Sequence, residues 1–221
     1  MDFLKSIAIA ASGLRAQAGR MRVISENIAN ADSTAPAPGG NPYRRKIPTF
    51  RSEIDRALDV NLRAPMMLAR AAGPAMTARG GGHIVFISSM GAKAVGPALG
   101  VYSATKAGLR ALALALRQDL RASGVGVSVI LPGPIGDAGM WADTGIPTPR
   151  GAGKPRTADD VARAVIDAIE HNRFEIEVAS FAVRIGGALA QVRPTWFVAL
   201  GRRNGANDIA VQMTDAARNK R

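Results

Sequence analysis

Three side chains in the middle of this sequence have the types and the spacing of an acid/base site. Tyr102 and Lys106 are four residues apart in a segment, residues 102–121, whose leucines recur at helical spacing, so the two side chains share one face of a predicted helix. An ammonium group beside a phenol stabilises the phenolate, which lets Tyr102 pass a proton to or from a substrate oxygen. Ser89 ends residues 82–89, a predicted buried strand, where its hydroxyl can hydrogen-bond a carbonyl group under attack.

A Tyr-x-x-x-Lys pair alone is usually a surface pair on a helix, but here other residues stand in register with it. The set resembles the short-chain dehydrogenase/reductase family, whose signature is a Ser followed by Tyr-x-x-x-Lys, with an Asn on the preceding helix. Asn61 lies where that family keeps its Asn, and residues 125–135 are similar to the strand and Pro-Gly turn beside the nicotinamide. The resemblance implies an oxidoreductase that transfers a hydride between a carbonyl and an alcohol.

The resemblance also implies a role for each matching residue. Tyr102 is expected to be the general acid/base, Lys106 to favour the phenolate and hold the ribose, Ser89 to orient the substrate oxygen, and Asn61 to support the proton relay. The implied cofactor is NAD or NADP, and the implied substrate is a small carbonyl compound or alcohol. The expected cofactor contacts are Tyr102, Lys106, Pro132, Gly133 and Ile135.

The phosphate-binding part of such a site is not found in this sequence. Members of the family open with a strand, a Gly-x-x-x-Gly-x-Gly turn and a helix, because glycines let the backbone approach the pyrophosphate. Glycines 39–40 follow a proline-rich loop, and glycines 80–82 precede a strand instead of following one, so neither has the required context. Asp137 adds an acid close to the Pro-Gly turn, which would repel a pyrophosphate. The sequence therefore leaves open whether the chain is an enzyme, and it favours an inactive one.

The N-terminus carries a different pattern. Apolar residues in alternating steps of three and four predict a helix over residues 3–29 with a narrow seam that needs a partner helix. Its sequence, with Asn-Ile-Ala-Asn at residues 27–30, closely resembles the start of flagellar rod and hook proteins, and residues 42–46 look most like the proximal rod protein C. This resemblance covers residues 1–55 and implies contacts with flagellar rod subunits. A rod structural protein of bacterial motility is therefore the alternative function.

The two resemblances meet near residue 55, so we interpret the chain as a chimera. Residues 1–55 are expected to form the rod-type helix and loop, and residues 56–221 the C-terminal part of a short-chain dehydrogenase/reductase domain without its Gly-rich half. The fold class is α/β, an incomplete Rossmann-like doubly wound fold of about three parallel strands behind a coiled-coil-like helix. The predicted strands are 83–89, 125–131 and 174–179, and the predicted helices are 53–79, disturbed at Pro65 and Pro74, 102–121, 158–171 and 207–220, with a loop from 132 to 156.

Such a fragment has consequences for its partners. Strand 83–89 would lack one neighbour, and an unprotected apolar edge favours aggregation or a homo-oligomer.

The charge of +12 attracts phosphates, but the basic clusters are short and lack interleaved aromatics, so no specific nucleic-acid function is expected. Without cysteine and with two histidines, a metal site is not expected either. The apolar run at residues 6–11 is too short for a membrane span, so the predicted location is the cytoplasm, with the flagellar basal body as the alternative.

Overall fold

The computed structural model describes residues 21, 25–30, 53–146, 148 and 152–203. The chain divides into two units, Met1–Ser52 and Glu53–Arg221. In the first unit, residues 25–29 are helical, and the side-chain amide of Asn30 donates a 2.8 Å hydrogen bond to the carbonyl of Glu26. The remainder of the predicted helix 3–29, the following loop and the predicted helix 207–220 lie outside the described residues.

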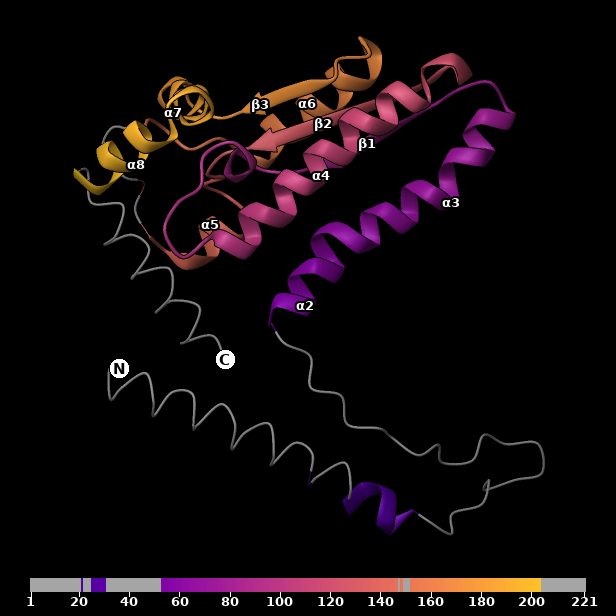
Figure 1. Ribbon diagram of the computed structural model, residues 1–221, viewed down its shortest axis with the longest axis horizontal. Coiled ribbons are helices and arrows are strands. Elements are labelled where there is room, and N and C mark those ends of the chain that lie inside the picture. Colours follow the sequence, from indigo (N-terminus) through magenta and orange to yellow (C-terminus); the bar gives the residue numbers. More distant parts are fainter. Residues whose placement is uncertain (1–20, 22–24, 31–52, 147, 149–151, 204–221) are drawn as a thin grey trace. The chain divides into compact units, whose positions relative to one another are not determined.

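The second unit is built on one sheet of three parallel strands (Figure 1). The strand order is β1-β2-β3, with bounds Gly82–Ile87, Val125–Pro132 and Glu175–Val178. Ile87 pairs with Ile130, and Val129 with Glu175. The central strand β2 is rich in Val, Ile and Leu and almost wholly buried, as expected for a parallel strand that is covered on both faces. The predicted α/β class with three parallel strands is thus confirmed.

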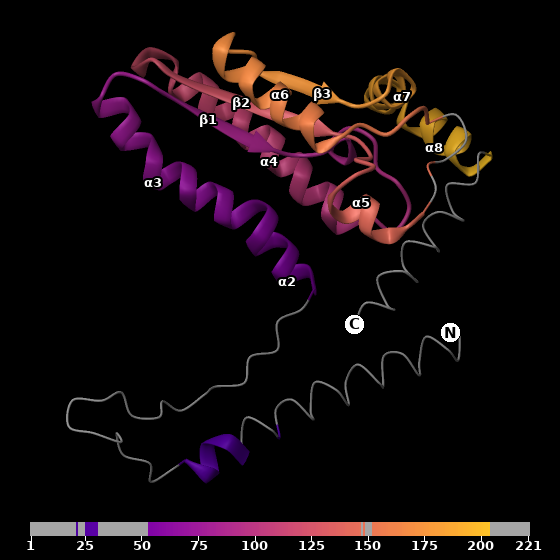
Figure 2. The ribbon, with the colours of Figure 1, turned by 180° about the vertical axis from the view of Figure 1, so that it is seen from behind.

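Helices cover the two faces of this sheet. Helices α3 (Ala64–Ala78) and α4 (Gly100–Asp119) pack Ala69, Leu109 and Ala113 against the odd-numbered side chains of β2. Helix α6 (Ala158–Glu170) packs Ala164 and Ala168 against Ile130 on the opposite face. Figures 1 and 2 show α4 and α6 on opposite sides of the sheet. The alternation of side chains along β2 therefore divides the core into two layers.

The segment before α3 is not a regular α-helix. Helix α2 (Glu53–Leu58) runs into a π-helical turn, Asp59–Arg63, which leads directly into α3. Pro65 explains this turn, because it has no N–H to donate to the carbonyl of Asn61 four residues earlier and its ring crowds that carbonyl. The predicted disturbance at Pro65 is thus a widened turn that contains Asn61. Pro74 stands inside α3 without ending it.

The start of α6 matches the predicted helix 158–171, and a local signal sets it. The Thr157 hydroxyl accepts a hydrogen bond from the N–H of Asp160, and the Asp160 carboxylate accepts one from the N–H of Thr157, which together form a capping box. The predicted loop from 132 to 156 is wrong over α5 (Gly139–Thr144), a short helix bounded by two glycines with positive φ. Helices α7 (Phe181–Val192) and α8 (Pro194–Arg203) are likewise absent from the sequence prediction.

Candidate active site

Ser89 lies in the loop that follows β1, at the carboxyl edge of the sheet. Its backbone is extended, and its hydroxyl accepts a 3.0 Å hydrogen bond from the N–H of Gly91, which caps a 3-10 turn over Met90–Ala92. The neighbouring hydroxyl of Ser88 is buried and donates a 2.8 Å hydrogen bond to the carbonyl of Lys106 on α4. This contact fixes the Ser89 loop to the helix that carries the other site residues.

Helix α4 places Tyr102 and Lys106 one turn apart, as predicted. The Lys106 Nζ lies 5.8 Å from the centre of the Tyr102 ring and donates a 3.1 Å hydrogen bond to the carbonyl of Ile87, the last residue of β1. Both side chains are half-buried. Burial lowers the pKa of Lys106, because desolvation disfavours its charged form. The ammonium therefore stays beside the phenol in a partly dehydrated position, where its field acts more strongly than in water.

Gly91 is the point at which Ser89 and Tyr102 meet. A Cβ on Gly91 would lie 3.4 Å from the Ser89 Oγ, from the Tyr102 Cε1 and from the Ser103 Oγ. A Cβ here would touch all three groups, so glycine leaves the point between the serine and the tyrosine free of a side chain. Ser103 is 2% exposed, and among the described residues its Oγ has no hydrogen-bond partner. A buried hydroxyl of this kind can still accept or donate one bond at the site.

Asn61 shares a cavity with Lys106. It lies half-buried in the π-helical turn and lines a cavity of about 470 Å³ together with Lys106, Ile87 and Leu109. This cavity lies between the α2–α3 segment and β1. The structure therefore brings Lys106 close to Tyr102 and places it in one cavity with Asn61, while Ser89 approaches Tyr102 at Gly91.

The predicted cofactor contacts after β2 lie at the same edge of the sheet. The N–H of Ser88 donates to the carbonyl of Ile130, which places the end of β1 next to the end of β2. Beyond Pro132, the N–H of Gly133 donates a 2.9 Å hydrogen bond to Val178, and Ile135 forms an isolated bridge with Arg156. Pro132 and Gly133 are thus held by β3, and Ile135 by the segment just before α6.

Asp137 has a structural contact in this loop. Its Oδ1 accepts a 2.9 Å hydrogen bond from the N–H of Ala158, the first residue of α6. A carboxylate at a helix N-terminus is favourable because the N–H groups there carry partial positive charge.

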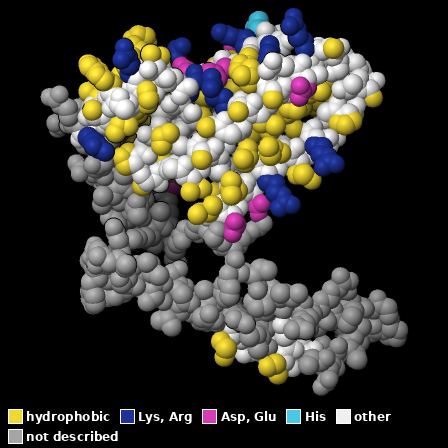
Figure 3. Space-filling model, viewed as in Figure 1, with side chains coloured by type: hydrophobic (Ala, Val, Ile, Leu, Met, Phe, Trp, Pro, Cys, Tyr) yellow, Lys and Arg dark blue, Asp and Glu magenta, His cyan; other side chains and the backbone are white. Residues whose placement is uncertain are grey.

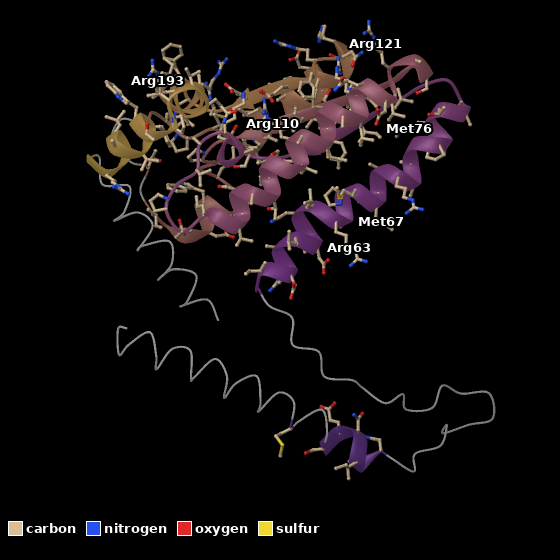
Figure 4. The ribbon with its side chains drawn as sticks, viewed as in Figure 1. Arg63, Met67, Met76, Arg110, Arg121 and Arg193 are labelled. Atoms are coloured by element: carbon tan, nitrogen blue, oxygen red, sulfur yellow. The ribbon has the colours of Figure 1, made fainter. Side chains whose placement is uncertain are left out.

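A cluster of charges behind the Ser89 loop was not found from the sequence. Lys93 contacts both Glu175 and Glu177 on β3, Arg110 on α4 lies 2.5 Å from Glu175, and Arg184 on α7 lies 3.2 Å from Glu177. Figure 4 labels Arg110 on its helix. The alternate spacing of Glu175 and Glu177 on one strand was the signal that could have indicated a shared face.

The charged groups in this cluster shift one another's pKa. Burial alone would lower the pKa of Lys93, but its bonds to Glu175 and Glu177 outweigh this effect and raise it. Burial alone would raise the pKa of Glu175, but Arg110 and Lys93 lower it. The cluster links the loop of Ser89 to β3, α4 and α7.

The two histidines make structural contacts, and His83 also lines the cavity that Asn61 and Lys106 share. His83 on β1 is 2.7 Å from the Ser128 hydroxyl, and its pKa is lowered by burial and by the nearby Arg117. His171 follows α6 and contacts Asp167.

Among the described residues, no group of three or more His, Asp or Glu side chains could hold a metal ion. In the same part of the chain, no helix has the length and apolar character required to cross a membrane.

Comparison with known proteins finds two families in one chain. The family of short chain dehydrogenases matches residues 39–146, and the flagella basal body rod protein family matches residues 7–35. The chain is 37% identical over 149 residues to a ketoacyl reductase, HetN, of Nostoc sp., which covers 65% of this chain. It is 58% identical over 61 residues, 27% of this chain, to the flagellar basal-body rod protein FlgC of Agrobacterium fabrum.

Solved structures agree on the α/β part. A short chain dehydrogenase from Burkholderia cenocepacia in complex with NADP matches with a TM-score of 0.56 and 28% identity, over 69% of this chain and 60% of that protein. A short-chain dehydrogenase from Streptomyces avermitilis matches with a TM-score of 0.53 and 25% identity, over 70% and 63%. The chain spans 52% of the Nostoc protein and 44% of the Agrobacterium protein.

Proposed function

This chain joins a flagellar rod segment to a segment of the short-chain dehydrogenase/reductase family, and from that premise we propose that residues 53–203 hold the substrate side of an NAD(P)-dependent oxidoreductase site. The approach of Ser89 and Tyr102 at Gly91, with Lys106 beside Tyr102, is the observation that carries this proposal. A serine hydroxyl and a phenol that converge on one open point can bind the same substrate oxygen.

Each residue has a chemical task in this proposal. Tyr102 gives a proton to the carbonyl oxygen during reduction and takes it back during oxidation. Lys106 stabilises the phenolate by its charge, and Ser89 donates a hydrogen bond that orients the oxygen. The carbonyl of Asn61, freed by Pro65, accepts a hydrogen bond on the path that returns the proton to solvent through the cavity it shares with Lys106.

The nicotinamide end of a cofactor fits the residues at this edge of the sheet. Tyr102 and Lys106 supply two half-buried donors, and the backbone from Pro132 to Ile135 follows Ile130, which pairs with Ile87 at the end of β1. A bound NAD or NADP would supply or accept the hydride. The segment from 136 to 156 would border a small carbonyl or alcohol substrate.

We further propose that the chain alone is inactive. Its sequence has no Gly-x-x-x-Gly-x-Gly turn, and the pyrophosphate of a dinucleotide needs closely approaching backbone N–H groups. Cofactor binding would then rest on the nicotinamide end alone. The proposed location of this product is the cytoplasm.

A graft experiment tests both statements. Residues 1–55 are replaced by the dinucleotide-binding half of the Nostoc ketoacyl reductase, and NADPH oxidation is measured with a small diketone. We expect no turnover by the original chain and turnover by the graft, which Tyr102→Phe lowers by at least about 100-fold. The exposed residue Arg121 provides the control variant Arg121→Gln, which should leave the rate unchanged. A graft that melts cooperatively and binds NADPH but never turns over would contradict the oxidoreductase proposal.

The proposed lack of dinucleotide binding by the original chain has its own test. A thermal melt with about 1 mM NADH or NADPH would rise by several degrees if the dissociation constant were near 10 μM, because a hundredfold excess of ligand stabilises the native state by about 2.7 kcal/mol. We expect no shift for the original chain. A clear rise that Lys106→Met abolishes would show that the chain binds the cofactor at this site without a Gly-rich turn, and would contradict the expected lack of cofactor binding.

A second candidate function rests on the 58% identity of the N-terminus to a rod protein. The Asn30–Glu26 hydrogen bond closes the helical stretch at the Asn-Ile-Ala-Asn sequence. We propose that this segment can contact flagellar rod subunits. Fractionation of flagellated cells that express the chain tests this: basal bodies should retain the chain, and they should not retain a version without residues 1–52. Equal retention of both versions would exclude the rod contact.

A further inference from the structure

Helix α7 is apolar on two opposite sides. Its inner side buries Gly187 and Ala190 against the body. Its outer side carries Phe181, Ile185 and Val192, whose exposed fractions are 76%, 52% and 76%. These three positions fall within a narrow sector of the helix at about 100° per residue, so they form one continuous stripe. Within the described part of the chain, this stripe of large apolar side chains lies opposite the buried face and is mostly exposed.

Helix α8 also carries exposed apolar side chains. It packs on α7, where a Cβ on Gly186 would lie 3.6 Å from the Phe197 ring. On α8, Trp196, Val198 and Leu200 are 72%, 45% and 49% exposed. Figure 1 shows α7 and α8 next to each other at one end of the body. The two helices therefore present apolar side chains over their combined length of more than twenty residues.

The charged residues of α7 and α8 and of the link between them are all of one sign. Residues 181–203 contain four arginines and no Asp or Glu. Arg184 and Arg193 flank the apolar stripe of α7 on its two sides, and Arg202 is exposed on α8. Arg184 pairs with Glu177 of β3. Figure 4 labels Arg193 where α7 meets α8, and Figure 3 shows apolar and basic side chains mixed at this end of the body. An apolar centre with Trp and a rim of Arg matches the boundary between lipid headgroups and acyl chains.

We propose that α7 and α8 dock on the surface of an anionic lipid bilayer and lie in the plane of its interface. At twelve and ten residues, each helix is too short to span a bilayer, which needs about twenty. Lipid fits this surface better than a second copy of the chain. Two copies paired through the same face would bring their arginines together without an acid from α7 or α8 to neutralise them.

Vesicle sedimentation of the full chain tests the docking. We expect binding to vesicles of phosphatidylcholine with phosphatidylglycerol, and weak binding to phosphatidylcholine alone. Arg193→Gln and Arg202→Gln should each weaken binding about fivefold. The double variant Phe181→Ser/Trp196→Ser should weaken it more than tenfold. All four side chains are exposed, so the variants should keep the wild-type circular dichroism spectrum. Ile166 is 54% exposed on α6, and Ile166→Ser is the matched control that should bind like the wild type.

Tryptophan fluorescence gives a second measurement. The chain has two tryptophans, so Trp141→Phe leaves Trp196 as the sole reporter. Its emission should shift to the blue on addition of anionic vesicles, and brominated acyl chains should quench it. Absence of sedimentation with every vesicle, or equal loss of binding in Ile166→Ser, would overturn the proposal. So would a concentration-dependent dimer that Trp196→Ser dissociates, because a second copy would then cover this face.

Discussion

The ammonium of Lys106 donates a 3.1 Å hydrogen bond to the carbonyl oxygen of Ile87. Ile87 is the last residue of β1, and Lys106 lies one turn after Tyr102 on α4. One charged side chain therefore joins the end of the strand before Ser89 to the helix that carries the candidate acid/base. This position is unfavourable for the ammonium, because burial disfavours the charged form and lowers the pKa of Lys106.

The lowered pKa of Lys106 predicts that the stability of the protein depends on pH. Because the folded-state pKa of Lys106 lies below 10.5, the unfolded chain binds more protons between the two pKa values, and stability rises with pH in that window. Lys106→Met removes this contribution. We therefore expect the wild-type free energy of unfolding to rise relative to the variant as the pH increases towards 10.5. Urea denaturation at several pH values measures it.

The control for this experiment is Lys154→Met, at an exposed lysine. Its difference from the wild type should not change over the same pH range. A Lys106→Met difference that is equally flat would contradict the burial effect.

The charge cluster behind the Ser89 loop predicts a loss of stability on Glu175→Gln. The side chains of Lys93 and Glu175 are 13% and 18% exposed, so removal of the carboxylate leaves Lys93 and Arg110 with one partner fewer in a poorly solvated place. We expect a loss of about 2 kcal/mol at pH 7, below the range for fully buried pairs. Chemical denaturation gives this value.

The difference in stability between the wild type and Glu175→Gln should also depend on pH in the acid range. The folded-state pKa of Glu175 is lowered by Arg110 and Lys93 against the opposing effect of burial. The stabilisation is therefore fully present above the usual value of 4.5 and is lost as the pH falls through the folded-state pKa. The wild type and Glu175→Gln should become equally stable in strong acid. Asp167→Asn, at the exposed Asp167–Arg173 pair, should show little effect at pH 7.

Two glycines form a matched pair for a packing test. A Cβ on Gly126 would lie 2.3 Å from the Nδ1 and 2.6 Å from the Cε1 of His83, whose ring is held by Ser128. Gly126→Ala should therefore destabilise the protein by about 1–3 kcal/mol. Gly81→Ala should have a small effect, because no atom lies within 4 Å of its Cβ position. Thermal melts that rank the two variants the other way would show that His83 moves freely.

The outer edge of β1 predicts self-association. Among the described residues, β1 pairs only with β2, and Ile87 is 43% exposed. Ile87→Lys should reduce aggregation, because a charged side chain on an edge strand opposes pairing with another chain. Light scattering and size-exclusion chromatography measure this. Ile166→Lys makes the same chemical change on α6 and should leave the aggregation unchanged; if both variants act alike, the edge is not the cause.

Sequence patterns predicted much of the α/β unit. The apolar run of β2, the leucine spacing of α4 and the capping box at Thr157 are local signals, and the structure confirms the element that each one predicts. Helix α5 was missed because it has only six residues. The boundary near residue 55 and the catalytic roles of Asn61, Ser89, Tyr102 and Lys106 remain predictions.

The sequence by itself determined the two family resemblances, the parallel α/β class and the candidate residues, because these depend on residue types at short and regular spacings. Only the tertiary structure decided that Gly91 separates Ser89 from Tyr102 and that Lys93 contacts Glu175 across 82 positions of the chain. It also decided that, among the described residues, one side of α7 is exposed. Such contacts depend on which faces of strands and helices meet, and the periodicity of a single segment gives its faces but not their partners.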